Sequence, residues 1–186
     1  AHHQAVRDLG KDFVVSGRAP GGAGGREADS RGRLPPTSGK EIPVIVLFDT
    51  NVVLDLLLDR RPFAFEAAQL VDQVARQRLQ GLLGATTLTT IHYLAQRRVG
   101  DGGARRFMES LLSIFEVAPV GREVLLDALR LKLPDYEDAV LRESARRAGA
   151  TAIVTRDVKG FVEAELVTYQ PGELLHILKV SRARRQ

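Results

Sequence analysis

The first clear strand signal in the sequence is the run Val44-Ile45-Val46-Leu47-Phe48, which leads directly into Asp49-Thr50-Asn51. Five consecutive apolar residues, three of them β-branched, are typical of a short strand that is buried on both faces of a parallel sheet. The polar residues that follow indicate that the strand ends at Asp49. We therefore expect a buried strand whose carboxyl end carries an aspartate.

Strand and helix signals alternate over the rest of the chain. Apolar runs predict further strands at residues 81–85, 115–118, 151–155 and 166–168. Helical periodicity predicts helices around residues 52–57, 65–74, 87–98, 104–114, 123–131, 136–148 and 171–178. Strands separated by helices predict a three-layer α/β/α sandwich with a mostly parallel central sheet of four to five strands.

The two ends of the chain differ in composition from its middle. Residues 1–40 contain eight of the 17 glycines and three of the eight prolines, without a sustained period, so we predict a disordered segment over residues 1–42. The folded domain is expected at residues 43–178. Residues 179–186 contain four basic residues and no acidic one, and are predicted to form a basic tail.

Charge and composition exclude several functional classes. The net charge is +4, but residues 41–178 hold 16 basic and 19 acidic residues, so the folded part is not a broad cationic platform. The absence of Cys excludes disulfides and thiolate metal sites. The apolar runs are far shorter than the roughly 20 residues that span a bilayer, and no signal peptide opens the chain. We expect a cytoplasmic protein without a membrane partner.

Acidic residues follow two of the predicted strands and begin one predicted helix. Asp49 ends the first strand, Asp157 lies just beyond the strand at 151–155, and Asp135 and Asp138 share a face at the start of the helix that follows Pro134. Each alone is compatible with a turn, an N-cap or a helix-dipole partner. A parallel sheet would aim several of them at the crevice outside its carboxyl edge. Such a cluster predicts a hard divalent cation, Mg²⁺ or Mn²⁺.

Three motifs in this order resemble those of the PIN domain family. They are Phe48-Asp49-Thr50-Asn51, Asp135-x-x-Asp138-Ala139, and Val154-Thr155-Arg156-Asp157-x-x-x-Phe161. The resemblance implies a metal-dependent endoribonuclease acting on single-stranded RNA, of the kind found as VapC-type toxins in toxin–antitoxin pairs. It also implies a Mg²⁺ or Mn²⁺ cofactor, an antitoxin partner and a homodimer.

The same resemblance assigns roles to individual residues. Asp49, Asp138 and Asp157 would be the catalytic, metal-binding acids, and Asp135 a further metal ligand. Asn51, Thr155 and Thr90 would be polar supports, and Arg156 and His92 are candidates for RNA contacts. Thr90 stands where the family commonly supplies an acid, and Gly160 precedes Phe161 where the family often has Asp. These two departures imply weaker metal binding or a degenerate site.

Two other functional classes stay open at this point. Thr90 and Gly160 favour a catalytically degenerate PIN-like module that binds RNA or protein. A phosphohydrolase of the haloacid dehalogenase type would also place an aspartate after its first strand, but it needs a second Asp at the position of Asn51. No Gly-x-Ser-x-Gly nucleophile motif is present, and the histidines lack the spacing of a zinc site.

Overall fold

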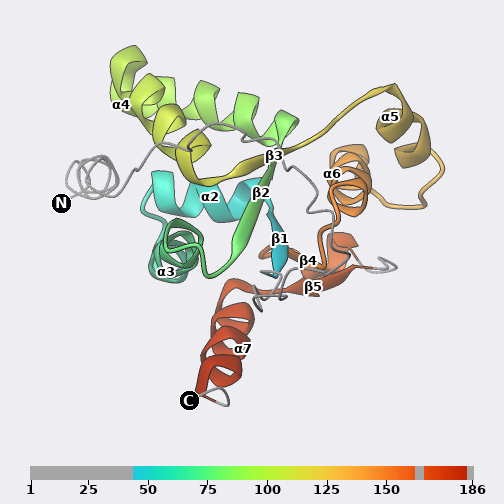
Figure 1. Ribbon diagram of the computed structural model, residues 1–186. Coiled ribbons are helices and arrows are strands. Elements are labelled where there is room, and N and C mark those ends of the chain that lie inside the picture. Colours follow the sequence, from blue (N-terminus) through green and yellow to red (C-terminus); the bar gives the residue numbers. More distant parts are fainter. Residues whose placement is uncertain (1–43, 162–165, 184–186) are drawn as a thin grey trace, which may run out of the picture.

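The computed structural model describes residues 44–161 and 166–183, and the predicted disordered segment 1–42 lies outside them. Within these residues, five parallel strands form one sheet in the order β3-β2-β1-β4-β5 (Figure 1). The strands are β1 (Ile45–Phe48), β2 (Gln80–Gly84), β3 (Glu116–Ala118), β4 (Ala152–Val154) and β5 (Val167–Tyr169). The strand predicted at residues 44–48 is thus the centre of the sheet.

Helices cover both faces of the sheet. They are α2 (Thr50–Leu57), α3 (Phe63–Ala75), α4 (Ala85–Ile114), α5 (Arg122–Ala128), α6 (Tyr136–Arg147) and α7 (Pro171–Ala183), with a short 3₁₀ helix η1 (Val158–Phe161). Side chains of α2, α3, α4 and α7 pack with Val46 and Phe48 on one face, whereas those of α6 pack with Leu47 on the other. This arrangement confirms the predicted three-layer α/β/α fold.

The central position of β1 follows from its side chains. Val46, Leu47 and Phe48 are all completely buried, as expected for a strand whose two faces both meet helices. Phe48 lies level with Leu83 of β2 on one side and with Val154 of β4 on the other. The backbone N–H of Asp49 donates to the carbonyl oxygen of Val154 at 3.0 Å, so the segment after β1 lies beside the segment after β4.

The strand order reverses between β1 and β4. From β1 the chain first builds β2 and β3 on one side, and later returns to place β4 and β5 on the other. Parallel α/β sheets have their ligand crevice at such a switch point, outside the carboxyl ends of the strands. Asp49 follows β1 and Asp157 follows β4, so both lie at this crevice.

Some helix limits differ from the predicted ones. The two helices predicted at 87–98 and 104–114 form one element that is broken at Gly100, whose φ of 76° is accessible to glycine at little cost. α5 ends at Ala128 rather than at the predicted residue 131, and so stops before Pro134. α7 continues to Ala183, into the predicted tail, because residues 179–183 contain no Gly or Pro to end it.

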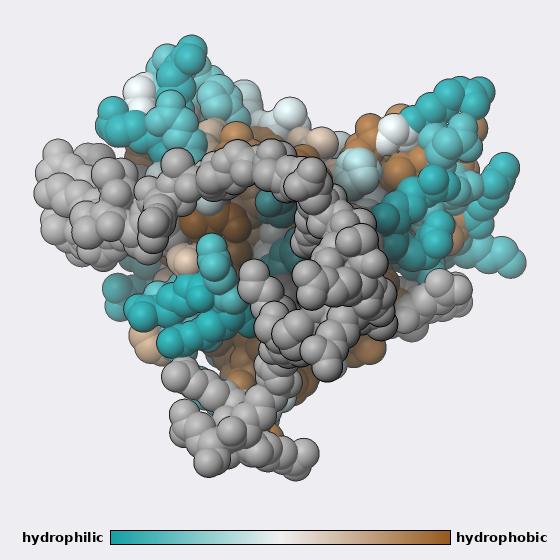
Figure 2. All heavy atoms as spheres, viewed as in Figure 1, coloured by the Kyte–Doolittle hydropathy of each residue, from teal (hydrophilic) through white to brown (hydrophobic). Residues whose placement is uncertain are grey.

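The outer surface of α4 is hydrophilic, as expected for the side of a helix that faces away from the sheet (Figure 2). Hydrophilic side chains gather over the outer part of α4 (Figure 2), where Arg97, Arg98, Arg105 and Arg106 are exposed. None of the described helices combines the length and the apolar character that crossing a bilayer requires.

The contact between β2 and β3 gives a first prediction. A Cβ atom on Gly81 would lie 2.5 Å from the Phe115 ring and 2.9 Å from the Val74 side chain. Gly81→Ala is therefore expected to lower the free energy of unfolding by about 1–3 kcal/mol through overpacking, measured by chemical denaturation. Gly102→Ala is the control, since the nearest neighbour of its new methyl group would be the flexible end of Arg106 at 3.6 Å. Equal stability of the two variants would contradict the packing seen here.

Candidate active site

Asp49 occupies the end of β1 and the N-cap of α2, and its side chain is 6% exposed. Its Oδ2 accepts hydrogen bonds from Thr155 Oγ1 at 2.6 Å and from Asn51 Nδ2. Burial raises the pKa of Asp49, and the hydrogen bond from Thr155 opposes that rise. Thr155 and Asn51 therefore both bind the Asp49 carboxylate through hydrogen bonds.

Thr155 also organises the segment that follows β4. Its Oγ1 accepts from the backbone N–H of Asp157 at 3.0 Å and from Asn51 Nδ2 at 3.0 Å. The backbone N–H of Gly160 donates to Asp157 Oδ1 at 3.3 Å, which turns this exposed carboxylate toward the start of η1. One threonine hydroxyl thus links Asp49 to the backbone of Asp157.

Asp138 reaches the same place from α6. A Cβ atom on Gly160 would lie 2.8 Å from Asp138 Oδ2 and 3.5 Å from Asp157 Oδ2, so both carboxylates approach this glycine. The pKa of Asp138 is raised to about 6, first by burial and then by the charges of Asp49, Asp135, Asp157 and Glu137. Asp49, Asp138 and Asp157 come from three separate segments, and we call these three residues the acidic cluster.

Asp135 and Glu137 lie at the edge of the cluster. Asp135 is exposed and is the N-cap of α6, where its Oδ1 accepts from the backbone N–H of Glu137 at 2.7 Å. Its side chain is therefore already engaged in capping, the local role that its sequence position allows. The pKa of Glu137 is raised by burial and then by Asp135 and Asp49. Glu137 therefore lies close enough to the cluster to be affected by the charge of Asp49.

Thr90 and His92 both lie on α4. Thr90 and His92 are both partly buried, and among the described residues no hydrogen bond joins either of them to the acidic cluster. Instead Thr87, which is completely buried, pairs its Oγ1 with Thr50 Oγ1 at 2.9 Å. Thr87 therefore fixes the start of α4 to the residue directly after Asp49, a role that the sequence did not indicate.

Arg156 contacts two residues, Asp55 and Phe63, that were not predicted to belong to the site. Its Nε lies 3.0 Å from Asp55 Oδ2, and its guanidinium carbon lies 4.6 Å from the centre of the Phe63 ring. Asp55 is 1% exposed. The signal that could have identified it is its position as the only charged residue among the apolar residues 52–57.

The donor set is chemically suited to a hard divalent cation. All candidate ligands are carboxylate oxygens. Burial and then repulsion from the neighbouring acids raise the pKa of Asp138, and a bound cation would relieve that repulsion. Within the described residues, no three carboxylate or imidazole groups already stand at coordinating positions. Binding a cation at the acidic cluster therefore requires its side chains to move from the positions seen here.

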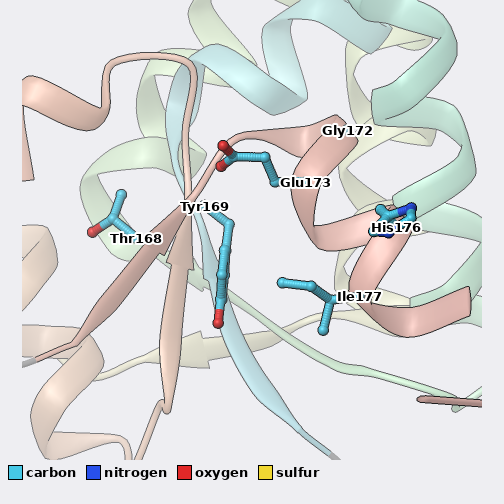
Figure 3. A pocket seen from close by; sticks show the side chains of 6 residues that line it. All are labelled: Thr168, Tyr169, Gly172, Glu173, His176 and Ile177. Carbon is cyan, nitrogen blue, oxygen red and sulfur yellow. The ribbon is translucent and has the colours of Figure 1, made fainter. Parts of the chain in front are cut away.

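A concave region lies away from the acidic cluster. Figure 3 shows a groove between β5 and α7 that is lined by Thr168, Tyr169, Gly172, Glu173, His176 and Ile177. Glu173 Oε2 accepts from the backbone N–H of Gln170 at 2.9 Å and so caps α7. None of the acids predicted as ligands lines this groove, and the acidic cluster remains the candidate site.

Comparison with known proteins identifies the family. A PIN domain model matches residues 45–159, which include every predicted acid, and the chain belongs to the PIN domain family. No significant relative was found among curated proteins.

Solved structures have the same fold. The FitAcB structure from Neisseria gonorrhoeae contains a chain with 18% identity and a TM-score of 0.54, aligned over 68% of this chain and 98% of that one. A chain of a toxin–antitoxin complex from Klebsiella pneumoniae has 22% identity and a TM-score of 0.53, aligned over 68% of this chain and 97% of that one. A chain of VapBC2 from Rickettsia felis, bound to a promoter DNA fragment, has 13% identity and a TM-score of 0.53, aligned over 68% of this chain and 98% of that one. At these identities the likeness shows the fold alone.

Proposed function

We propose that this PIN domain is a metal-dependent endoribonuclease that hydrolyses phosphodiester bonds in single-stranded RNA. The observation that carries the proposal is the convergence of Asp49, Asp138 and Asp157 at the switch point of the sheet, with the pKa of Asp138 raised to about 6 by burial and by neighbouring acids. Three carboxylates that repel one another are costly unless a cation is bound.

In this proposal the acidic cluster holds Mg²⁺ or Mn²⁺, with Asp135 at its edge. When bound, the cation supplies polarisation of a water for in-line attack on phosphorus and neutralises charge on the departing oxygen. Thr155 and Asn51 both donate to Asp49 Oδ2, and among the described residues no side chain donates to Oδ1. Gly160 leaves the space between Asp138 and Asp157 open, because it has no side chain.

The biological setting is part of the proposal. We propose that the chain acts in the cytoplasm as the toxin of a toxin–antitoxin pair, neutralised by an antitoxin, and that it forms a homodimer. Its support is the likeness in fold to chains of the Klebsiella, Neisseria and Rickettsia structures, of which the first is a toxin–antitoxin complex and the last is VapBC2 bound to promoter DNA.

The primary test is cleavage of an end-labelled, unstructured RNA by the full chain. We expect cleavage with Mn²⁺ or Mg²⁺, none after chelation with EDTA, and recovery when metal is restored. The matched duplex RNA should be cut far more slowly. RNA binding with no cleavage at any metal concentration would reject the nuclease.

That rejecting result would support the second candidate, a degenerate binding module. Its specific support is that Thr90 and Gly160 stand where acids are common in the family, and that Thr90 makes no hydrogen bond to the cluster among the described residues. Single-stranded RNA should then bind equally well with Mn²⁺ and with EDTA.

The open space at Gly160 gives a second prediction. In Gly160→Ala the new methyl group would lie 2.8 Å from Asp138 Oδ2, so this carboxylate must move. We expect Mn²⁺ affinity, measured by calorimetry, to fall about tenfold, the scale seen when groups that orient metal ligands are altered. The melting temperature should change little, because Gly160 is partly exposed. Gly102→Ala is the control, and unchanged affinity in Gly160→Ala would place the cation elsewhere.

A further inference from the structure

Asp55 is a buried carboxylate that the proposed reaction does not use. It lies on α2 with both carboxylate oxygens inaccessible to solvent and without a hydrogen-bond partner among the described residues. Its charged neighbours are Arg156 Nε at 3.0 Å and the partly exposed Arg60 Nη1 at 3.8 Å. A buried ion pair of this kind is a poor source of stability, since apolar residues of similar volume usually stabilise a core as well or better. Another role is therefore needed to explain it.

Arg156 is held at three points. Its Nε contacts Asp55, its guanidinium stands over the Phe63 ring at 4.6 Å, and its backbone N–H donates to Asn51 Oδ1 at 3.2 Å. Asn51 and Asp55 belong to α2, and Phe63 begins α3. Arg156 is thus fixed, by side chain and by backbone, to the helices that follow Asp49.

The residues on either side of Arg156 point the other way. Ile153 packs on the α6 face of the sheet and Val154 on the α2 and α3 face. The alternation continues past the strand, because Thr155 contacts Asp49 and Asp157 approaches Gly160, which lies beside Asp138. Arg156, like Val154, contacts the α2 and α3 side, at Asp55 and Phe63. It is therefore an anchor between two residues of the candidate site.

From this geometry we infer that Asp55 is a positioning residue, which fixes residues 155–157 through Arg156 from the side opposite the acidic cluster. The consequence for metal binding rests on the proposed function, but the fixing of the segment does not. As the partner of Asp55, Arg156 fixes the backbone of residues 155–157. The family resemblance had instead predicted that Arg156 contacts RNA.

The first readout is amide hydrogen exchange in the metal-free, full chain. The N–H groups of Arg156, Asp157 and Gly160 each donate to a side-chain oxygen, so their exchange reports the order of the segment. In Asp55→Asn and Arg156→Gln we expect exchange over residues 156–160 to rise about tenfold, with the strands β1 and β2 unchanged. Arg156→Lys, which keeps the charge but loses the planar contact with Phe63, should fall between these variants and the wild type.

The second readout is the affinity for Mn²⁺ alone, measured by calorimetry. Asp55→Asn and Arg156→Gln should each weaken it about 10–100-fold, the scale for residues that orient metal ligands. The double variant should lose no more than either single variant, because both changes remove one ion pair. Asp72→Asn is the matched control, since Asp72 forms an exposed ion pair with Arg76 on α3 and should affect neither readout.

Two results would separate this inference from its alternatives. A lower melting temperature with unchanged local exchange and unchanged Mn²⁺ affinity would show a structural ion pair and overturn the inference. A wild type that binds no Mn²⁺ would reject the proposed function, and the exchange data alone would then decide the role of Asp55. If Asp55→Asn does not fold, the double variant and Arg156→Lys carry the comparison.

Discussion

Asp49→Asn is expected to remove most Mn²⁺ binding and to lower RNA cleavage by roughly 10²–10³-fold, the range for losing one preorganised electrostatic group. The amide oxygen of Asn can still accept from Thr155 Oγ1 and Asn51 Nδ2, so the hydrogen bonds around the position are retained. Burial already raises the pKa of Asp49, so a neutral side chain is tolerated there. The variant should therefore fold normally while losing a charged ligand.

Calorimetric titration with Mn²⁺ and a melting curve of each protein test this result. Asp72→Asn is the control, because it makes the same chemical change at an exposed acid of α3. Wild-type metal affinity in folded Asp49→Asn would exclude Asp49 from the site. Loss of folding would instead show that its carboxylate is needed for the structure.

Asp138→Asn is expected to have opposite effects on activity and on metal-free stability. The pKa of Asp138 rises from 3.8 to about 6, so the folded state keeps this proton at pH values where the unfolded state has lost it. The contribution of Asp138 to stability is therefore greatest below pH 3.8, decreases as pH rises to about 6, and stays constant above. The wild type without metal should become less stable between pH 5 and 7.

The variant should lack this decrease. At pH 7 we expect metal-free Asp138→Asn to be more stable than the wild type by about 1 kcal/mol, after a discount for solvent screening of a partly exposed carboxyl group. Mn²⁺ binding and RNA cleavage should be lost at the same time. Glu143 does not disturb this window, because hydrogen bonds from Arg146 and Arg147 lower its pKa to about 2, which affects stability only below its ordinary pKa of 4.5.

Melting curves at pH 5, 6 and 7 in EDTA measure this effect, and repetition with Mn²⁺ should reverse the trend, because metal binds the ionised form. Identical pH dependence in wild type and variant would show that Asp138 ionises as an ordinary surface acid.

The features that depend on local signals could be predicted from the sequence. The apolar run at 44–48 indicated a buried parallel strand, and the alternation of strands and helices indicated the layered sheet that is now confirmed. Asp49 and Asp157 were placed at the same crevice because both follow strands. Their roles in metal binding and catalysis remain predictions.

The features that depend on distant partners could not be predicted. Asp55 stands in an apolar run, and its partner Arg156 follows a hundred residues later, so neither residue alone indicates a buried pair. The link between Thr87 and Thr50 joins two helix starts that only the sheet order brings together. Asp135 has two compatible local roles, and the hydrogen bond that caps α6 is visible only in three dimensions.

Because the chain is synthesised from its N-terminus, β1 is made long before β4 is available to pair with it. Asp49 and Thr155 are separated by 106 residues, and they meet only when β4 adds to a strand made near the beginning of the domain. The chain must lose the entropy of closing this long loop before the contact can stabilise it, so this pairing is among the slow, non-local steps of folding. A nascent chain that ends before β4 lacks Thr155 and Asp157 altogether. The candidate site therefore comes into existence only after nearly the whole domain has left the ribosome, and partly made chains carry no assembled acidic cluster.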